Sequence, residues 1–335
     1  MDPREKTEIG TSGLRVTKLG FGGAPLGGLF SDVPSDEAIQ SVIKALTMGV
    51  CFFDTAPHYG LGKSERFMAE ALDGVPRDDF VLSTKVGRVL NPSKNPPAIP
   101  EFENVPNLKE VWDYSRDGVL RSIEESMCRL NLDRIDIALI HDLDIAAAED
   151  PDHWRRAVEE AYPTLDDLRA QGVLKAIGAG LNDSYPCVKL SEEGDFDCFL
   201  PAGRYTLLDQ SALDELLPLC ERKGISVIIG GPYNSGILAS DLSPGAKYFY
   251  QDAPAEVLQR ANRIKSICDR HEVPLKAAAL QFCLGHPAVV SVIPGARCTT
   301  EVEENMRMAG LEVPRDLWKE LRSEGLIREE VPFSE

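Results

Sequence analysis

The sequence predicts an α/β fold, a single closed (β/α)8 TIM barrel over residues 1–335. Eight strand-like runs alternate with helix-like runs along the 335 residues, and this alternation is typical of a parallel α/β protein. Several strand-like runs are continuously apolar, as expected for strands covered on both faces. No G-x-G-x-x-G turn follows the first run, and this disfavours an open doubly wound sheet, the main competing fold.

The strand pattern recurs at intervals from the N-terminus to residue 295. The expected strands are VTKLGFGGA (16–24), CFFDTA (51–56), FVLSTKV (80–86), IDIALIH (135–141), LKAIGAG (174–180), CFLPAGRY (198–205), ISVIIGGP (225–232) and VVSVIPG (289–295).

Helical periodicity fills many of the intervals between these runs. In SDEAIQSVIKALTMG (35–49) the apolar residues share one stripe, with Ser35 as the expected N-cap and Gly49 following the last turn. Pro163 is expected to bend or divide the helix that contains it. The other expected helices are SERFMAEALDG (64–74), DGVLRSIEESMCRLN (117–131), HWRRAVEEAYPTLDDLRAQG (153–172), ALDELLPLCERKG (212–224), TTEVEENMRMAG (299–310) and an extra C-terminal helix, RDLWKELRSEG (315–325).

Two further segments have expected places at the ends of the barrel. TEIGTSGLRVTK (7–18) precedes the first strand and predicts a short hairpin around Ser12 and Gly13 that caps the N-terminal end. NPSKNPPAIPEFENVPN (91–107) is rich in proline and asparagine and follows the third strand. A loop of this length at the C-terminal face is typical of a substrate-site wall.

Composition excludes several classes of partner. The net charge of −18 would repel nucleic acid and anionic membranes. The eight cysteines form no C-x-x-C pair, so we expect reduced, structural thiols and a cytoplasmic protein. The charged start MDPREKTEIG predicts no signal peptide, and no apolar stretch approaches the roughly 20 residues of a membrane span. We expect a monomer or a homodimer.

Four polar residues lie where strand-like runs end. Asp54 and Tyr59 follow the second run, Lys85 closes the third and His141 closes the fourth. The carboxyl ends of parallel strands share one face of a barrel, where catalytic residues gather. A carboxylate, a phenol, an ammonium and an imidazole would therefore meet there, and this set suits reversible proton transfer to a carbonyl oxygen.

Each of the four residues also has a purely structural interpretation. Lys85 ends a buried run and needs a carboxylate partner. Asp54 supplies one, but the pair could be a salt bridge and nothing more. Tyr59 beside an ammonium is expected to have a lowered pKa, although it could simply pack in its loop. His141 either orients a substrate oxygen or is a core histidine. His58 has no second ligand at metal spacing, so we expect no metal.

Two glycine-rich strand ends predict a phosphorylated ligand. IPGARCTTEVEEN (293–305) runs from strand to turn to helix, where free backbone N–H groups and Arg297 would favour phosphate. IGGPYNSGIL (229–238) offers backbone that a pyrophosphate could approach. The two segments follow the seventh and eighth strands, which is a common phosphate location in such barrels.

Six motifs in a fixed order strengthen this interpretation: FDTAPHYGLGKSE, STKVG, LIHD, IGAGLND, GPYNSGIL and IPGARCTTEVEEN. Together they resemble the aldo-keto reductase superfamily across residues 16–305. The resemblance implies an oxidoreductase whose barrel, without a Rossmann domain, binds NAD or NADP across its mouth. Tyr59 would be the general acid/base, Lys85 would tune it, Asp54 would hold Lys85, and His141 would orient the substrate oxygen.

The resemblance also implies a set of cofactor contacts. Gly22, Gly23 and Ala24 would lie near the nicotinamide ribose and Asn182 near the carboxamide, and Asp54 would also contact the cofactor. Tyr233 and the segment Ser235, Gly236 to Leu238 would line the pyrophosphate. The adenosine end would be held by Gly295, Arg297, Glu301, Glu304 and Asn305.

Three departures from the superfamily pattern bear on the cofactor. Ala202 stands where typical members place a glutamine near the carboxamide. Gly295 and Glu301 stand where many NADP-dependent members have lysine and arginine. Glu301 would repel a 2′-phosphate and accept a bond from a ribose hydroxyl. Arg297 would instead attract the 2′-phosphate. Weighing Glu301 against Arg297, we predict a preference for NAD.

The forms of the second and fourth strand motifs resemble one branch, the D-threo-aldose, L-fucose and L-galactose 1-dehydrogenases, with a pyridoxal 4-dehydrogenase nearby. This implies oxidation of an aldopyranose at C1 to a lactone, with sugar contacts from the segment 112–116. Open alternatives are a pyridoxal 4-dehydrogenase, a broad-range aldehyde or ketone reductase, a Schiff-base aldolase using Lys85, and a cofactor-binding sensor without catalysis.

Overall fold

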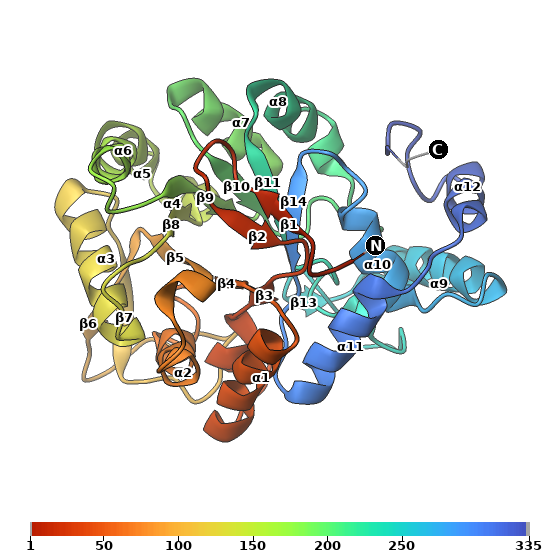
Figure 1. Cartoon of the computed structure of the whole chain (residues 1–335), viewed down its shortest axis with the longest axis horizontal. Coiled ribbons are helices and arrows are strands. Elements are labelled where there is room, and N and C mark those ends of the chain that lie inside the picture. Colours follow the sequence, from red (N-terminus) through yellow and green to blue (C-terminus); the bar gives the residue numbers. More distant parts are fainter. Residues whose placement is uncertain (1, 333–335) are drawn as a thin grey trace.

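The computed structural model, which describes residues 2–332, contains the expected eight-stranded parallel barrel (Figure 1). The strands are hydrogen-bonded in the order β14-β11-β10-β9-β8-β5-β4-β3. Parallel bridges from Leu19 to Val292 and from Gly22 to Gly295 join the first strand to the last and close the cylinder. The barrel strands are β3 (Phe21–Gly22), β4 (Phe52–Asp54), β5 (Val81–Val86), β8 (Ile137–His141), β9 (Ala176–Leu181), β10 (Cys198–Pro201), β11 (Ser226–Gly230) and β14 (Val289–Ile293).

The prediction for the first strand was too long. Val16 and Thr17 belong to a separate strand, β2 (Arg15–Thr17), which pairs antiparallel with β1 (Lys6–Glu8). This is the expected N-terminal hairpin. Its buried residues Ile9 and Val16 pack with Phe52 and Ile137 at the N-terminal end of the barrel. Figure 1 shows the red hairpin lying across that end, where it shields apolar side chains from water.

Helices surround the barrel on all sides (Figure 1). They are α1 (Ser35–Thr47), α2 (Lys63–Leu72), α3 (Arg116–Leu130), α4 (Leu143–Glu149), α5 (Asp152–Arg156), α6 (Tyr162–Ala170), α7 (Ser184–Glu193), α8 (Leu216–Lys223), α9 (Ala255–Arg270), α10 (Leu275–Cys283), α11 (Thr299–Gly310) and α12 (Arg315–Ser323).

Two predictions about helix ends and bends were wrong in part. Ser35 is the first helical residue and not the N-cap, because Pro34 takes the cap position and no side chain caps the helix. Gly49 follows α1 with φ of 91°, as expected of a C-terminal stop. Pro163 neither divides nor ends its helix. A π-helical turn, Ala157–Ala161, joins α5 to α6 immediately before it, and such a turn accommodates local strain within a continuous helix.

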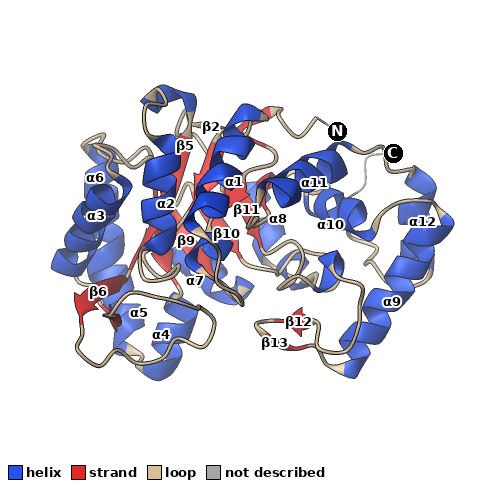
Figure 2. Cartoon of the chain, turned by 90° about the horizontal axis from the view of Figure 1, so that it is seen from below, coloured by secondary structure: helices blue, strands red, loops and turns tan. Residues whose placement is uncertain are grey.

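The C-terminal end of the barrel carries two hairpins, on the side opposite β2 (Figure 2). One pairs β6 (Arg88–Pro92) with β7 (Leu108–Trp112), and the other pairs β12 (Lys247–Tyr248) with β13 (Gln251–Asp252). The predicted loop 91–107 begins two residues too early, because Asn91 and Pro92 still pair in β6, and residues 93–107 form the tip of the first hairpin. It is attached to the segment after β3, because Phe30 N–H donates to the Glu101 carbonyl at 2.9 Å and Leu29 bridges to Phe102.

The structure also describes the cysteines and the helices. All eight cysteines are free thiols. Between residues 2 and 332, no helix combines the length and apolar character that crossing a bilayer requires. The same part of the chain holds no cluster of three histidine, cysteine or acidic side chains arranged to bind a metal.

Candidate active site

Asp54 and Lys85 form a buried ion pair at the carboxyl ends of β4 and β5. Lys85 Nζ donates to Asp54 Oδ2 at 2.7 Å and to the Thr55 carbonyl at 2.9 Å. The register of the two strands places Ser83 opposite Asp54, and Ser83 Oγ donates to Asp54 Oδ1 at 2.7 Å. The side chains of Lys85 and Asp54 are only 1% and 2% exposed. A buried pair of this kind requires full hydrogen bonding, which the strand ends provide.

Tyr59 reaches the same place from the loop after β4. Lys85 Nζ lies 4.6 Å from the centroid of the Tyr59 ring. The loop can bend this sharply because Gly60 has φ of 64° and packs on Gly27, where an added Cβ would lie 2.3 Å from the Gly27 carbonyl oxygen. The sequence prediction that Asp54, Tyr59 and Lys85 lie together is therefore matched by the structure.

The expected lowering of the Tyr59 pKa is wrong for this arrangement. Burial raises the pKa of Tyr59 well above its usual value, and the carboxylates of Asp54 and Asp142 raise it further. Only Arg88 acts in the opposite direction. Asp54 offsets the charge of Lys85 at 2.7 Å, so the neighbouring ammonium does not dominate. The phenol thus holds its proton firmly at neutral pH.

His141 lies edge-on to Tyr59, with the ring centroids 5.9 Å apart. Burial lowers the pKa of His141 well below its usual value, and Lys85, Arg88 and His58 act in the same direction. The imidazole is therefore neutral at neutral pH, with one N–H donor. Its Nδ1 is buried with no hydrogen-bond partner among the described residues. Such a group is suited to orient a substrate oxygen, and Tyr114 fixes the His141 backbone by donating to its carbonyl at 2.6 Å.

A layer of charged residues surrounds His141 and Tyr59, and the sequence interpretation gave it no role. Arg88 on β6 donates to Asp142 at 2.7 Å and to Glu110 at 3.0 Å. Glu110 on β7 is 2.7 Å from His58 Nδ1. Burial opposes ionisation of Glu110, yet His58 and Arg88 hold its pKa below the usual value. The carboxylate is thus ionised and accepts from both neighbours.

Asn182, the predicted carboxamide contact, is held by three separate groups. Its Nδ2 donates to Asp142 Oδ1 at 2.9 Å, its backbone N–H donates to Asp144 Oδ2 at 2.9 Å, and its carbonyl accepts from Arg204. Because Asp142 takes the amide N–H, the side-chain oxygen of Asn182 is left for a ligand. Ala202, on the neighbouring strand end, offers no polar side-chain atom.

Asp144, which accepts from the Asn182 backbone N–H, has an unusually high pKa. Burial and the charge of Asp142 raise the pKa of Asp144 to about 6, and its Oδ1 is buried with no hydrogen-bond partner in the described chain. The folded protein therefore binds the proton of the Asp144 carboxyl more tightly than the unfolded chain, in which the pKa of this carboxyl is near 3.8. The stability contributed by the protonated carboxyl is lost as the pH rises through about 6.

Replacing Asp144 with asparagine is expected to stabilise the protein above that pH. The amide oxygen can still accept from Asn182 N–H, while the buried charge disappears. We expect a gain of roughly 1–3 kcal/mol at about pH 7.5 and almost none at about pH 4. Urea unfolding at the two pH values measures the difference. Equal effects at both would contradict this assignment.

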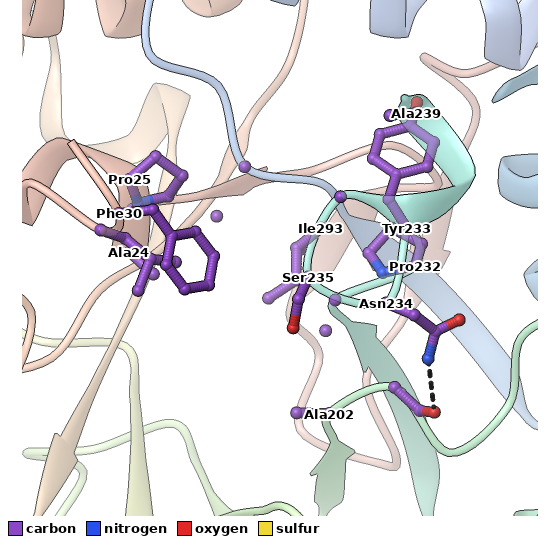
Figure 3. A pocket seen from close by; sticks show the side chains of 18 of the residues that line it. Ala24, Pro25, Phe30, Ala202, Pro232, Tyr233, Asn234, Ser235, Ala239 and Ile293 are labelled. Atoms are coloured by element: carbon purple, nitrogen blue, oxygen red, sulfur yellow. Dashed lines mark hydrogen bonds between the residues drawn. The ribbon is translucent and has the colours of Figure 1, made fainter. Parts of the chain in front are cut away.

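A cavity of about 460 Å³ lies at the barrel mouth, and its lining includes both Tyr59 and Asn305. Figure 3 shows Ala24, Pro25 and Phe30 on one side and Tyr233, Ser235 and Ala239 on the other. Lys85 and His141 are buried and do not line it. Leu238 was predicted to line it and does not, because its side chain is fully buried in the core. The other predicted cofactor contacts line this cavity: Gly22, Gly23, Ala24, Asp54, Asn182, Tyr233, Ser235, Gly236, Gly295, Arg297, Glu301, Glu304 and Asn305.

Aromatic side chains that the sequence interpretation missed border this cavity and lie near Tyr59. Phe30 and Tyr250 line the cavity, and their ring centroids lie 6.0 Å apart. The ring centroid of Phe102, at the tip of the β6–β7 hairpin, lies 6.3 Å from that of Tyr59 and 5.1 Å from that of His58. The predicted wall at 91–107 therefore reaches the reacting end. The expected sugar contact of Tyr114, within 112–116, is wrong because this side chain is fully buried. Trp112 donates to Glu149, and its sugar contact stays a prediction.

Two ion pairs neutralise the cations at the far end of the cavity. Arg297 Nη2 lies 2.6 Å from Glu301, which also accepts from the Arg297 backbone N–H at 2.8 Å. Lys276 on α10, which the sequence interpretation missed, lies 2.5 Å from Glu304. No local pattern marks Lys276, because α10 is apolar on most of its surface and its position beside α11 is a tertiary contact.

Comparison with known proteins identifies related sequences and folds. Residues 18–324 match the Aldo/keto reductase family. The chain is 40% identical to a pyridoxal 4-dehydrogenase from Microbacterium luteolum, covering 96% of this chain and 98% of that protein. It is also 40% identical to a D-threo-aldose 1-dehydrogenase from Pseudomonas sp, covering 94% and 96%. An L-galactose dehydrogenase from Arabidopsis thaliana is 31% identical, covering 90% and 87%.

The fold has close counterparts among solved structures. The aldo-keto reductase AKR11C1 from Bacillus halodurans in its holo form superposes with a TM-score of 0.76 at 23% identity, covering 98% of this chain and 97% of that one. The glycerol dehydrogenase AKR11B4 from Gluconobacter oxydans has a TM-score of 0.73 at 20% identity, covering 99% and 98%. These similarities confirm the predicted barrel fold.

Proposed function

Since the chain belongs to the aldo/keto reductase family, an oxidoreductase family, we propose that it oxidises the C1 hydroxyl of an aldopyranose to a lactone with NAD as the preferred cofactor. The observation that carries the proposal is the geometry of Tyr59, which lines the cavity while Lys85 and His141 flank its ring at 4.6 and 5.9 Å. The substrate class rests on the similarity to two dehydrogenases that are named for aldose sugars.

The residues present fit a nicotinamide dinucleotide. The cavity lining includes Tyr59 and Asn182 together with Arg297, Glu301 and Asn305, which follow β14. Gly22 pairs with Asp54 in the barrel register, and Gly23 N–H donates to the Asp54 carbonyl at 2.8 Å. Backbone without side chains thus lies beside the catalytic carboxylate, where the nicotinamide ribose would sit. The free oxygen of Asn182 would accept from the carboxamide N–H.

The same geometry supplies the proton chemistry of the reaction. When bound, the oxidised nicotinamide supplies a hydride acceptor. Tyr59 accepts the proton of the C1 hydroxyl, and the Lys85 ammonium stabilises the phenolate form that does so. Neutral His141 donates a hydrogen bond to the C1 oxygen. The hydroxyl thereby loses its proton and C1 loses a hydride, and the C1–O single bond becomes the carbonyl of the lactone. In the reverse direction Tyr59 returns the proton to the carbonyl oxygen.

A pyridoxal 4-dehydrogenase is the second candidate, because that relative is equally similar at 40% identity. Aromatic rings of Phe102 and His58 near Tyr59 would suit a flat heteroaromatic substrate. A broad-range aldehyde or ketone reductase is the third. A Schiff-base aldolase is disfavoured because Lys85 Nζ is buried and engaged by Asp54 and Thr55.

One substrate panel separates these candidates. NAD reduction is measured with L-fucose, L-galactose, D-arabinose and pyridoxal, and NADH oxidation with simple aldehydes. We expect the highest kcat/KM for one of the sugars and a lactone as its product. Activity confined to pyridoxal would support the second candidate, and efficient turnover only in the reductive direction would support the third.

The preference for NAD rests on the adenosine end of the cavity. Glu301 lines it and neutralises Arg297. A Cβ at Gly295 would lie 2.4 Å from Pro25 Cγ, so a phosphate-binding lysine does not fit there without displacing Pro25. We expect kcat/KM with NAD to exceed that with NADP at least about tenfold, and Glu301→Gln to narrow this ratio by releasing Arg297. A native preference for NADP would refute the prediction.

A further inference from the structure

Arg88 links two parts of the site that no shared strand or loop connects. Its guanidinium comes from the β6–β7 hairpin, is 11% exposed, and lies 4.1 Å from the centroid of the Trp112 ring. One Nη group donates to Asp142 at 2.7 Å and the other to Glu110 at 3.0 Å. Planar guanidinium is suited to such fixed, double-sided contacts in a way that a lysine ammonium is not.

Each of the two carboxylates holds a group next to the reacting atoms. Asp142 accepts from the side-chain amide of Asn182 at 2.9 Å and lies 3.4 Å from His141 Nε2. Glu110 is 2.7 Å from His58, whose ring lies 5.8 Å from that of His141. The contacts therefore run without a break from His58 on the substrate side, through Glu110, Arg88 and Asp142, to Asn182 on the cofactor side.

We propose that Arg88 is a positioning residue. Through this chain of contacts it couples His58, on the substrate side, to Asn182, on the nicotinamide side. The inference rests on the proposed roles of Tyr59 and Asn182. Arg88 neutralises Asp142, so that this carboxylate can hold the Asn182 amide without drawing a proton onto His141. It also fixes Glu110, which in turn sets the orientation of the His58 ring against the substrate.

Arg88 also affects the proton chemistry. The charged and titratable groups around Tyr59 come from several elements. They are Asp54 on β4, Lys85 on β5, Arg88 on β6, Glu110 on β7 through His58, His141 and Asp142 at the end of β8, and Tyr250 between β12 and β13. Among them Arg88 lowers the pKa of Tyr59 while Asp142 raises it. Removing Arg88 leaves Asp142 unpaired, so the pKa of Tyr59 should rise. Removing the charge of Asp142 should have the opposite effect.

The test compares Arg88→Gln, Arg88→Lys and Asp142→Asn with a matched control, Arg77→Gln. Arg77 forms a similarly enclosed pair with Asp136 at 2.6 Å, before β5 and away from the cavity. Titration with NADH, followed by fluorescence, measures cofactor binding without turnover. The pH dependence of kcat/KM is then measured with the best substrate of the panel described above.

We expect Arg88→Gln to weaken NADH binding about tenfold, because Asn182 loses its fixed orientation. The pH profile for oxidation should move upward by about one unit. Asp142→Asn should move the profile downward while keeping an amide oxygen for Asn182, and Arg88→Lys should recover only part of the loss. Arg77→Gln should lower the melting temperature and leave NADH binding and the pH profile unchanged.

Wild-type NADH affinity and an unshifted pH profile in Arg88→Gln would overturn the inference. The inference would also be overturned if Arg77→Gln changed NADH affinity and the pH profile as much as Arg88→Gln does, since this would indicate a general loss of structure. Failure of the sugar assignment is distinguishable, because the NADH titration needs no substrate and the profile can be measured with any compound that is turned over.

Discussion

Tyr59→Phe is expected to lower kcat/KM by about 10²- to 10⁴-fold, which is the usual contribution of a positioned general acid/base. The change removes a proton-carrying hydroxyl from a ring that lines the cavity beside Lys85. Among the described residues the Tyr59 hydroxyl makes no hydrogen bond, so its loss leaves no buried partner unsatisfied. Stability and NADH affinity should therefore be close to those of the wild type.

Steady-state kinetics in both directions, with an NADH titration, measure this effect. Tyr185→Phe is a matched control, because Tyr185 is 59% exposed on α7 and does not line the cavity. The pH profile gives an independent check. Because burial raises the Tyr59 pKa, oxidation by the native enzyme should accelerate from about pH 6 to about pH 10, whereas reduction should not require alkaline conditions. If Tyr59→Phe kept most of the turnover, another group would be the base.

Lys85→Met is expected to affect both stability and activity. It leaves the Asp54 carboxylate buried without its cation, and breaking a buried pair in this way typically costs about 3–5 kcal/mol. The Thr55 carbonyl also loses its donor. Oxidation should fall by a factor similar to that in Tyr59→Phe, since no ammonium then stabilises the phenolate form of Tyr59.

The double variant Asp54→Asn/Lys85→Met separates the two effects. Asparagine keeps an oxygen for the Ser83 hydroxyl, which donates to Asp54 at 2.7 Å, and no unpaired charge remains. Urea unfolding should show that the double variant recovers much of the lost stability, while kcat/KM stays low. If activity recovered together with stability, Lys85 would act only as a structural partner of Asp54, which is the alternative interpretation of this pair.

The sequence by itself determined the barrel and which polar residues gather at its mouth. Both depend on local patterns: apolar runs of strand length, and a polar residue such as Lys85 or His141 at the end of each run. Once eight parallel strands close into a cylinder, their carboxyl ends must share one face. The meeting of Asp54, Tyr59, Lys85 and His141 follows from chain connectivity and needs no knowledge of packing. The same holds for the glycine-rich ends of β11 and β14, which border the cavity.

Other features of the fold were not predictable from local patterns. Helix α10 buries residues on most of its surface, so it has no single apolar stripe to recognise. Helix α7 carries Pro186 in its first turn and only a weak stripe. The segment 88–112 has the composition of a loop at its tip, and its strands pair only with each other. These elements form because the rest of the barrel offers surfaces for them to cover.

The tertiary structure alone decided the electrostatics of the site. Arg88, Glu110 and Asp142 come from separate positions along the chain. Formation of the β6–β7 hairpin places Arg88 3.0 Å from Glu110 and 2.7 Å from Asp142. The sign of the Tyr59 pKa shift depends on burial and on the distances to every nearby charge, so a neighbouring lysine was insufficient to predict it. Sequence order specifies which groups arrive at the barrel mouth, but the energy of a buried proton depends on desolvation and distance, which exist only in the folded chain.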